Sequence, residues 1–158
     1  MSYLSELLRR EQIQLNLAGT DKSSVLRELV ALVPEIRSDA PQQECFLKAL
    51  LEREKLHTTA IGDGIALPHA RNPLGGILKR PLLIFGRHAT GIPFGALDTK
   101  PVHILFLLAS PNLTDHLTML ARLSRVLRDQ TLRTSLLATQ RIDDVSKFIS
   151  EAEQRTIK

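Results

Sequence analysis

Two short and nearly continuous apolar runs constrain the fold of this chain more than any other feature of its sequence. They cover residues 81–86 (PLLIFG) and 101–109 (PVHILFLLA), and turn-forming residues bound both runs. A strand that is buried on both faces has this pattern, whereas a strand with one solvated face alternates apolar and polar residues. The two runs therefore predict strands covered on both sides. A buried helical segment is the alternative, because periodicity alone does not separate the two for such short runs.

Segments with the apolar period of an amphipathic helix precede and follow these runs. The predicted helices cover residues 22–33, 41–55, a segment from 113 onward, and residues near 131–139 and 143–153. Pro34 ends the first of them, and Asn112 and Asp143 are predicted N-caps of later ones. Helices on both sides of the strands in sequence indicate an α/β sandwich with a central sheet.

Composition limits the class of protein. The 158 residues contain no repeat, low-complexity tract or Gly/Ser linker, so we expect a single domain over residues 1–158. A hydrophobic fraction of 43% and a charged fraction of 24% exclude a disordered chain. The single cysteine, Cys45, cannot form an internal disulfide, and the sequence has neither a signal peptide nor an apolar run of about 20 residues. We therefore expect a cytosolic (cytoplasmic) location and no membrane insertion.

The charge balance favours anionic partners. The chain has 21 Lys+Arg against 17 Asp+Glu, which gives a net charge of +4. Nucleic acid is one such partner, but the chain has no Trp and one Tyr, so a base-stacking surface is not expected. The arginines spread over residues 122–141 are expected to form a solvated helix face, and the alternative is that they dock an acidic protein or an anionic ligand.

The segment 58–71 (TTAIGDGIALPHAR) breaks the helical period and carries the first candidate for chemistry. Its β-branched and glycine residues predict short strands and tight turns, with Gly62 and Gly64 at the turn positions. Pro68 restricts the backbone next to His69, which holds the imidazole without placing it on a free helix surface. An exposed but fixed imidazole is suited to nucleophilic catalysis. The alternative is a histidine that only caps a turn.

His116 is the second candidate. It lies in the first turn of the helix predicted from residue 113, just beyond the second apolar run. A helix N-terminus favours an anion such as phosphate, and its partial positive charge keeps a nearby histidine neutral. Sheets of α/β proteins also place their ligands beyond the carboxyl ends of strands. The alternative is a histidine packed against the next loop.

Arg53 is the third candidate, because it ends the predicted helix 41–55 just ahead of the His69 loop. A guanidinium matches phosphate with paired donors and keeps its charge at any working pH. The segment LEREK is also ordinary composition for a helix end, where basic residues complement the helix dipole. Taken alone, Arg53 fits that second interpretation better.

The other histidines are weaker candidates. His103 lies within an apolar run and is expected to be a hydrogen-bonded residue of the core or the sheet face. His88 lies in RHATG, a predicted polar turn, and is expected to be exposed; His57 is expected to be solvated, although it could line the site. A metal site is not expected, since HExxH and paired cysteines are absent. Dinucleotide-loop, P-loop and GxSxG motifs are absent as well.

These residues resemble the active-site signature of the mannitol/fructose-type enzyme IIA domains of the bacterial phosphoenolpyruvate-dependent phosphotransferase system. The segment 53–71 (REKLHTTAIGDGIALPHAR) contains the Arg-Glu pair, the Thr-containing stretch and the GxGIAxPH core of that signature. Residues 91–111 resemble the family's strand-turn-strand unit, and residues 115–127 resemble the helix with its second histidine. The resemblance covers residues 4–153. Ala60 stands where the family usually has Gly, and His57 is unusual at its position; neither departure removes a phosphoryl-handling group.

The resemblance implies a fold and a reaction. The fold is a mixed central β-sheet flanked by helices on both faces. His69 would accept a phosphoryl group at Nε2 from a phosphohistidine of HPr or of its nitrogen-type relative, with no metal or organic cofactor. His116 would hydrogen-bond the phosphoryl group and Arg53 would neutralise it. Thr58 and Thr59 would be neighbours of the same group.

The family divides into sugar-transport components and a stand-alone nitrogen-regulatory subgroup. The chain resembles the second more, because it is short, begins at its own Met1 and carries a similar N-terminal segment, SELLRREQIQLNL. We therefore expect a nitrogen-regulatory phosphocarrier. One alternative is a sugar-specific enzyme IIA that passes phosphate to a cysteine of an enzyme IIB, and another is a regulatory binding module. A third is a metal-dependent hydrolase built from His57, His69 and His116.

Overall fold

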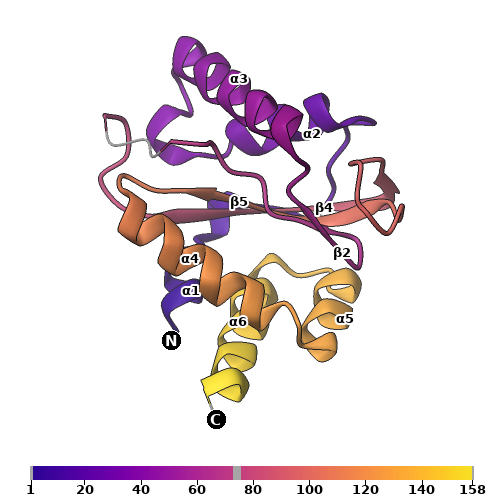
Figure 1. Ribbon diagram of the computed structural model, residues 1–158. Helices are drawn as coiled ribbons and strands as arrows, with labels where there is room; N and C mark the ends of the chain where they lie inside the picture. The colour runs from indigo at the N-terminus through magenta and orange to yellow at the C-terminus, as the bar shows by residue number, and fades with distance from the viewer. Residues whose placement is uncertain (1, 73–75, 158) are drawn as a thin grey trace.

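The computed structural model describes residues 2–72 and 76–157 and shows a five-stranded β-sheet between two layers of helices (Figure 1). The strands are β1 (Ile13–Gln14), β2 (Ala60–Gly62), β3 (Ile65–Ala66), β4 (Leu82–Ile92) and β5 (Val102–Ala109). Their order in the sheet is β1-β4-β5-β3-β2. β1 is parallel to β4 and β3 is parallel to β5, while the β4–β5 and β2–β3 pairs are antiparallel. The mixed sheet implied by the family resemblance is confirmed.

Helices cover both faces of this sheet. On one face lie α2 (Lys22–Val30) and α3 (Ala40–Leu56), and on the other lie α1 (Tyr3–Glu6), α4 (Leu113–Val126), α5 (Gln130–Ala138) and α6 (Ile142–Ile157) (Figure 1). Two short 3-10 helices span Arg10–Gln12 and Pro34–Ile36. The helices predicted from the sequence are confirmed, with boundaries shifted by a few residues at some ends. In the part of the chain that the structure describes, none of the helices combines the length and apolar character needed to cross a membrane.

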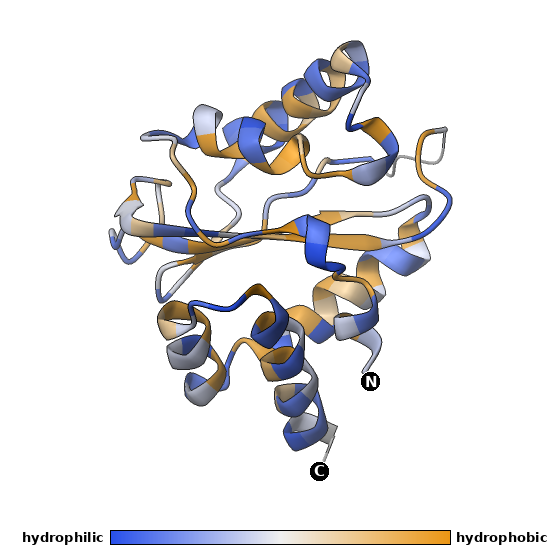
Figure 2. Ribbon diagram, turned by 180° about the vertical axis from the view of Figure 1, so that it is seen from behind, coloured by the Kyte–Doolittle hydropathy of each residue, from blue (hydrophilic) through white to orange (hydrophobic). Residues whose placement is uncertain are grey.

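The two apolar runs are strands because both of their faces are covered. Leu83 and Phe85 of β4 belong to the core beneath α1, α4, α5 and α6, whereas Leu82 and Ile84 belong to the core beneath α2 and α3. The ring centroid of Phe85 lies 5.1 Å from that of Phe106 on β5. Figure 2 shows the strands as a largely hydrophobic layer between helices whose outer sides are hydrophilic. Two-sided burial removes the alternation that a half-exposed strand would show.

One of the two helix caps predicted from the sequence is confirmed, and the other is wrong. The side chain of Asn112 accepts a hydrogen bond from the Asp115 backbone N–H at 2.8 Å, which confirms the predicted N-cap of α4. The predicted cap at Asp143 is wrong, because α6 already begins at Ile142 and Asp143 lies in its first turn. The backbone N–H of Asp144 bonds to the carbonyl of Arg141 at 3.2 Å, so the first turn closes one residue earlier than predicted.

His88 is not in a polar turn, and that prediction is wrong. β4 continues through residues 87–91 (RHATG) to Ile92, and His88 is 9% exposed. Its Nε2 donates to the Gly19 carbonyl at 2.8 Å, and its Nδ1 accepts from the Gly91 N–H at 3.0 Å. Both ring nitrogens therefore have backbone partners, which makes a buried polar residue tolerable within a strand.

His103 occupies the sheet-face position that its place in an apolar run predicted. Its Nδ1 donates to the backbone carbonyl of His88 on the neighbouring strand at 3.0 Å. Gly91 lies against the same ring with a φ of +84°, and a Cβ there would stand 2.8 Å from the ring Nε2. Only glycine accommodates both the backbone conformation and the close approach.

Arg87 is a buried cation that joins β4 to the end of α5. It is 6% exposed, and its guanidinium donates to backbone carbonyls from two distant segments. Its Nε bonds to Leu15 at 3.1 Å, and its Nη1 bonds to Leu136 at 3.1 Å, to Leu137 at 3.3 Å and to Thr139. The last three carbonyls lie at the C-terminal end of a helix, where a positive charge is favourable.

We expect Arg87→Met to lower the free energy of unfolding by roughly 2–4 kcal/mol, because several buried carbonyls would lose a charged donor at once. Urea unfolding followed by circular dichroism measures the effect. Arg9→Met, at an exposed arginine, is the matched control and should stay within about 0.5 kcal/mol of wild type. Equal unfolding midpoints for the two variants would contradict this account of Arg87.

Candidate functional site

The backbone around His69 is held by the edge of β5. After β3 the chain runs beside this strand, and the Leu108 N–H donates to the Pro68 carbonyl at 2.9 Å. His69 itself pairs with Leu108 as an isolated parallel bridge. Upstream, β2 and β3 are joined by a tight turn in which Asp63 has a φ of +56° and the glycines on either side are also left-handed. The short strands and turns predicted for this segment are confirmed.

A backbone contact orients the His69 ring. Its Nδ1 lies 2.8 Å from the Leu67 carbonyl oxygen, and a carbonyl can only accept. The proton therefore resides on Nδ1, and Nε2 carries a free lone pair. Burial lowers the pKa of the half-buried ring; the Leu67 carbonyl raises it, Arg53 lowers it further and Glu54 raises it. The net shift is downward, which favours the neutral ring at pH 7.

His116 lies directly beside this ring. The two ring centroids are 4.9 Å apart, with the planes inclined at 51°. Burial lowers the pKa of His116, and the neighbouring His69 lowers it further. The sequence predicted a neutral His116 from the helix N-terminus, and the structure adds burial and the second imidazole as the causes of its lowered pKa. A neutral imidazole can still donate one hydrogen bond.

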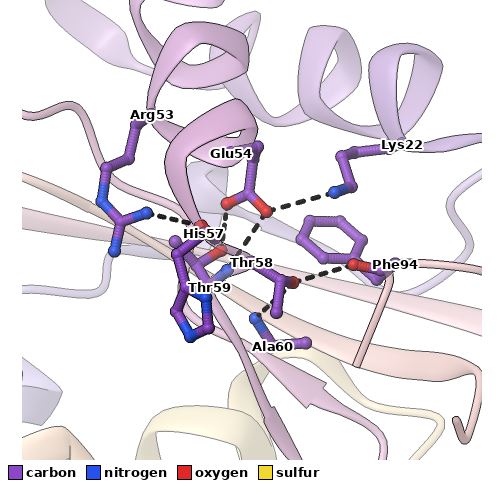
Figure 3. A network of polar contacts seen from close by, with 8 residues as sticks. All are labelled: Lys22, Arg53, Glu54, His57, Thr58, Thr59, Ala60 and Phe94. Atoms are coloured by element: carbon purple, nitrogen blue, oxygen red, sulfur yellow. Dashed lines mark hydrogen bonds and ion pairs between the residues drawn. The ribbon is translucent and has the colours of Figure 1, made fainter. Parts of the chain in front are cut away.

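Arg53 reaches the same place from the last turn of α3. Its Nη1 donates to the His57 carbonyl at 2.6 Å (Figure 3). Its charge is also close enough to lower the pKa of His69. A guanidinium has five N–H donors, so this contact orients the group without using it up. The structure thus brings Arg53, His69 and His116 together from three separate segments. His57 itself is exposed, as predicted.

Thr58 and Thr59 use their hydroxyl protons inside the protein. Thr58 Oγ1 donates to the Phe94 carbonyl at 2.8 Å and accepts from the Ala60 N–H at 3.1 Å. The Thr59 hydroxyl donates to the carboxylate of Glu54, and the side chains and their partners are drawn in Figure 3. The two threonines therefore hold the loop that follows α3. Their role as neighbours of a phosphoryl group stays a prediction.

Glu54 is the residue to which the sequence analysis gave no role. It is buried, and its carboxylate contacts Thr59 and the ammonium of Lys22. An acidic residue near a helix end is usually solvated, so no local pattern predicted the burial of Glu54. Its place in the Arg-Glu pair of the family signature was a hint that it has a role, but not that it is buried.

The arrangement suits the capture of an electrophilic, anionic group. It presents an imidazole lone pair, a second neutral imidazole and a guanidinium within one site, and these are the parts that phosphoryl transfer requires. Among residues 2–72 and 76–157, no group of three or more His, Cys, Asp or Glu side chains is arranged to hold a metal ion. His57 and the two site histidines therefore do not form such a group.

Comparison with known proteins agrees with this chemistry. A nitrogen regulatory protein of Bradyrhizobium diazoefficiens is 36% identical over 139 residues, which cover 87% of this chain and 88% of that protein. The fructose-specific EIIABC component of Bacillus subtilis is 30% identical over 153 residues; these cover 96% of this chain and 24% of that protein. This chain therefore spans about a quarter of the length of that relative.

The fold is shared with solved structures. The crystal structure of the nitrogen regulatory protein IIA-Ntr from Neisseria meningitidis superposes with a TM-score of 0.83 at 28% identity, and the match covers 94% of this chain and 99% of that one. The family model described as "Phosphoenolpyruvate-dependent sugar phosphotransferase system, EIIA 2" matches residues 6–152. This chain therefore belongs to the EIIA 2 family of the phosphoenolpyruvate-dependent sugar phosphotransferase system.

Proposed function

We propose that this chain is a phosphocarrier that accepts a phosphoryl group on Nε2 of His69. The observation that carries the proposal is the hydrogen bond from Nδ1 to the Leu67 carbonyl, because it leaves the Nε2 lone pair free and aims it away from the backbone. Membership of a phosphotransferase family supports the same reaction. The lowered pKa of His69 keeps that lone pair available at neutral pH.

The proposed donor is a phosphohistidine of HPr or of its nitrogen-type relative. The lone pair of Nε2 attacks phosphorus in line with the donor nitrogen, so one P–N bond forms as the other breaks. A donor ring that is protonated on its second nitrogen leaves as neutral imidazole. His69 keeps its Nδ1 proton on the Leu67 carbonyl, and no metal or organic cofactor takes part in this scheme.

The proposed roles of the neighbouring groups follow from their chemistry. Arg53 neutralises the charge on the equatorial oxygens of the transferring phosphoryl group, and His116 donates a hydrogen bond to one of them. Arg53 is anchored on the His57 carbonyl before the donor arrives, so little reorganisation of the guanidinium is needed during transfer. Neither group supplies the acceptor lone pair.

We propose the nitrogen-regulatory type in a cytoplasmic setting, because relatives with that name match this chain along most of their length and the Neisseria structure has the same fold. Phosphorylation then acts by adding negative charge, which changes the proteins that the surface docks. The second candidate is a sugar-specific enzyme IIA that passes phosphate to an enzyme IIB cysteine. The match to the fructose-specific Bacillus protein favours that second candidate.

His69→Ala should abolish phosphorylation and leave the fold intact, because a loop imidazole contributes little to the core. The measurement is uptake of label from phosphoenolpyruvate with Enzyme I and each of the two HPr-type carriers. Wild type should acquire acid-labile, base-stable label, and more quickly from the nitrogen-type carrier. His57→Ala, at the exposed histidine, should behave as wild type. Label on His69→Ala at the wild-type rate would show that another residue is the acceptor.

The transfer rate should rise with pH and reach half of its plateau below about 6.5, the ordinary pKa of histidine. The reason is that burial disfavours the protonated ring, so His69 loses its proton at a lower pH than a solvated histidine does. Ring NMR of unphosphorylated protein, assigned with His69→Ala, gives the titration midpoint, and single-turnover transfer should follow it. A midpoint at or above 6.5 would contradict the proposed environment.

His116→Ala and Arg53→Ala should each slow transfer by about 10–100-fold, because each removes one group that stabilises developing charge. Both variants should still acquire label slowly, since the acceptor remains. Single-turnover transfer from a phosphorylated carrier measures the effect, with Arg125→Ala, an exposed arginine on α4, as the control. Unchanged rates in both variants would remove these two residues from the mechanism.

A further inference from the structure

Glu54 is a carboxylate held out of water beside the site. Its side chain is 4% exposed, and both of its oxygens have partners. Oε1 accepts from the Thr59 backbone N–H at 3.1 Å and from Lys22 Nζ at 3.3 Å, and Oε2 accepts from the Thr59 hydroxyl. A buried carboxylate is costly unless it is paired and hydrogen-bonded, and this one is both.

Glu54 and Arg53 hold the same loop from two sides. Arg53 donates to the carbonyl of His57, and Glu54 accepts from Thr59, two residues further along. Consecutive helix positions point about 100° apart, and Figure 3 shows the two side chains leaving α3 in different directions. The place of the His57 carbonyl determines where the guanidinium lies. Glu54 therefore constrains Arg53 through the loop.

Lys22 supplies the positive charge that compensates the carboxylate of Glu54. The Glu54 carboxylate raises the pKa of His69, so its negative charge is felt at the ring. A phosphoryl group carries about −1.5 to −2 charge, and an uncompensated carboxylate nearby would repel it. Lys22 is the first residue of α2, and its Nζ also lies 4.5 Å from the centroid of the Phe94 ring. The backbone carbonyl of Phe94 accepts from the Thr58 hydroxyl, so Lys22 contacts two residues, Glu54 and Phe94, that each bind the loop.

We propose that Glu54 and Lys22 are positioning residues for phosphoryl transfer: Glu54 fixes the loop that orients Arg53, and Lys22 cancels the charge of Glu54 beside the incoming phosphoryl group. This inference rests on the proposed function of His69. Neither residue touches the reacting atoms. Their effect is on the orientation and the field in which His69 reacts.

An ion pair that only joins α2 to α3 would have a different signature. Its loss would lower the free energy of unfolding and leave the chemistry of the folded protein as it was. In the proposed pair, removal of the carboxylate should lower the pKa of His69, and removal of the ammonium should raise it, because the two groups have opposite charges.

The variants separate these effects. Glu54→Gln keeps the shape and one acceptor oxygen but removes the charge, and Lys22→Met keeps the length but removes the ammonium. Lys22→Arg retains a cation and tests for rescue. Glu52→Gln and Lys48→Met, at exposed positions on α3, are the matched controls. If Glu54→Gln does not fold, Glu54→Asp replaces it as the variant at this position.

Two measurements on each full-length variant test the proposal. In single-turnover transfer at saturating phosphorylated carrier, Glu54→Gln and Lys22→Met should each be slower than wild type by about 10–100-fold, since misplacement by about 1 Å has effects of this size. Lys22→Arg should recover most of the rate, and the controls should match wild type. In ring NMR of unphosphorylated protein, the His69 midpoint should move down in Glu54→Gln and up in Lys22→Met.

The outcomes distinguish this inference from the proposed function. Labelled wild type, together with wild-type rates and an unmoved His69 midpoint in both variants, would overturn the inference alone. The inference would also be overturned if the loss of transfer rate in each variant equalled the fraction of that variant that is unfolded. Wild type that takes label from neither carrier would overturn the proposed function and the positioning role with it. Opposite shifts of the His69 midpoint together with slowed transfer would establish the pair.

Discussion

The burial of β5 on both faces is the constraint on which the site depends. Residues 104–109 of this strand are buried, and helices cover the sheet above and below. One edge of the strand binds the Pro68 carbonyl and so fixes the backbone of His69. Its end leads through Asn112 into α4, which carries His116. A single buried strand therefore fixes the backbone of His69 and leads into the helix that carries His116.

The electrostatics of the site follow from that placement. Burial lowers the pKa of both half-buried imidazoles, and the neighbouring His69 lowers the pKa of His116 further, so the neutral forms are favoured. Arg53, anchored through the His57 carbonyl, adds a positive charge that lowers the pKa of His69. Glu54 and Lys22 lie behind it as a nearly neutral unit that ties α2, α3 and the loop together. Such a site favours an anion and disfavours protonation of the His69 ring.

Two of the differences between the sequence-based expectations and the structure, at RHATG and at Glu54, share one physical cause. The pattern RHATG predicts a polar turn, but Arg87 and His88 form hydrogen bonds with backbone carbonyls on segments remote in sequence. The position of Glu54 near a helix end is typical of a solvated residue, but Lys22 on another helix forms an ion pair with it. A polar side chain is predicted to face water unless its partner is known. Those partners come from tertiary structure, so no local pattern could reveal them.

The sequence by itself determined the two buried strands, the helices around them, the turn glycines, and the His, His and Arg that the family signature contains. Only the tertiary structure decided which nitrogen of His69 is free, that His116 lies 4.9 Å away, and that Glu54 is buried against Lys22. The reason is physical. Periodicity and turn chemistry are local properties, whereas tautomer, proximity and burial depend on which distant segments the sheet brings together.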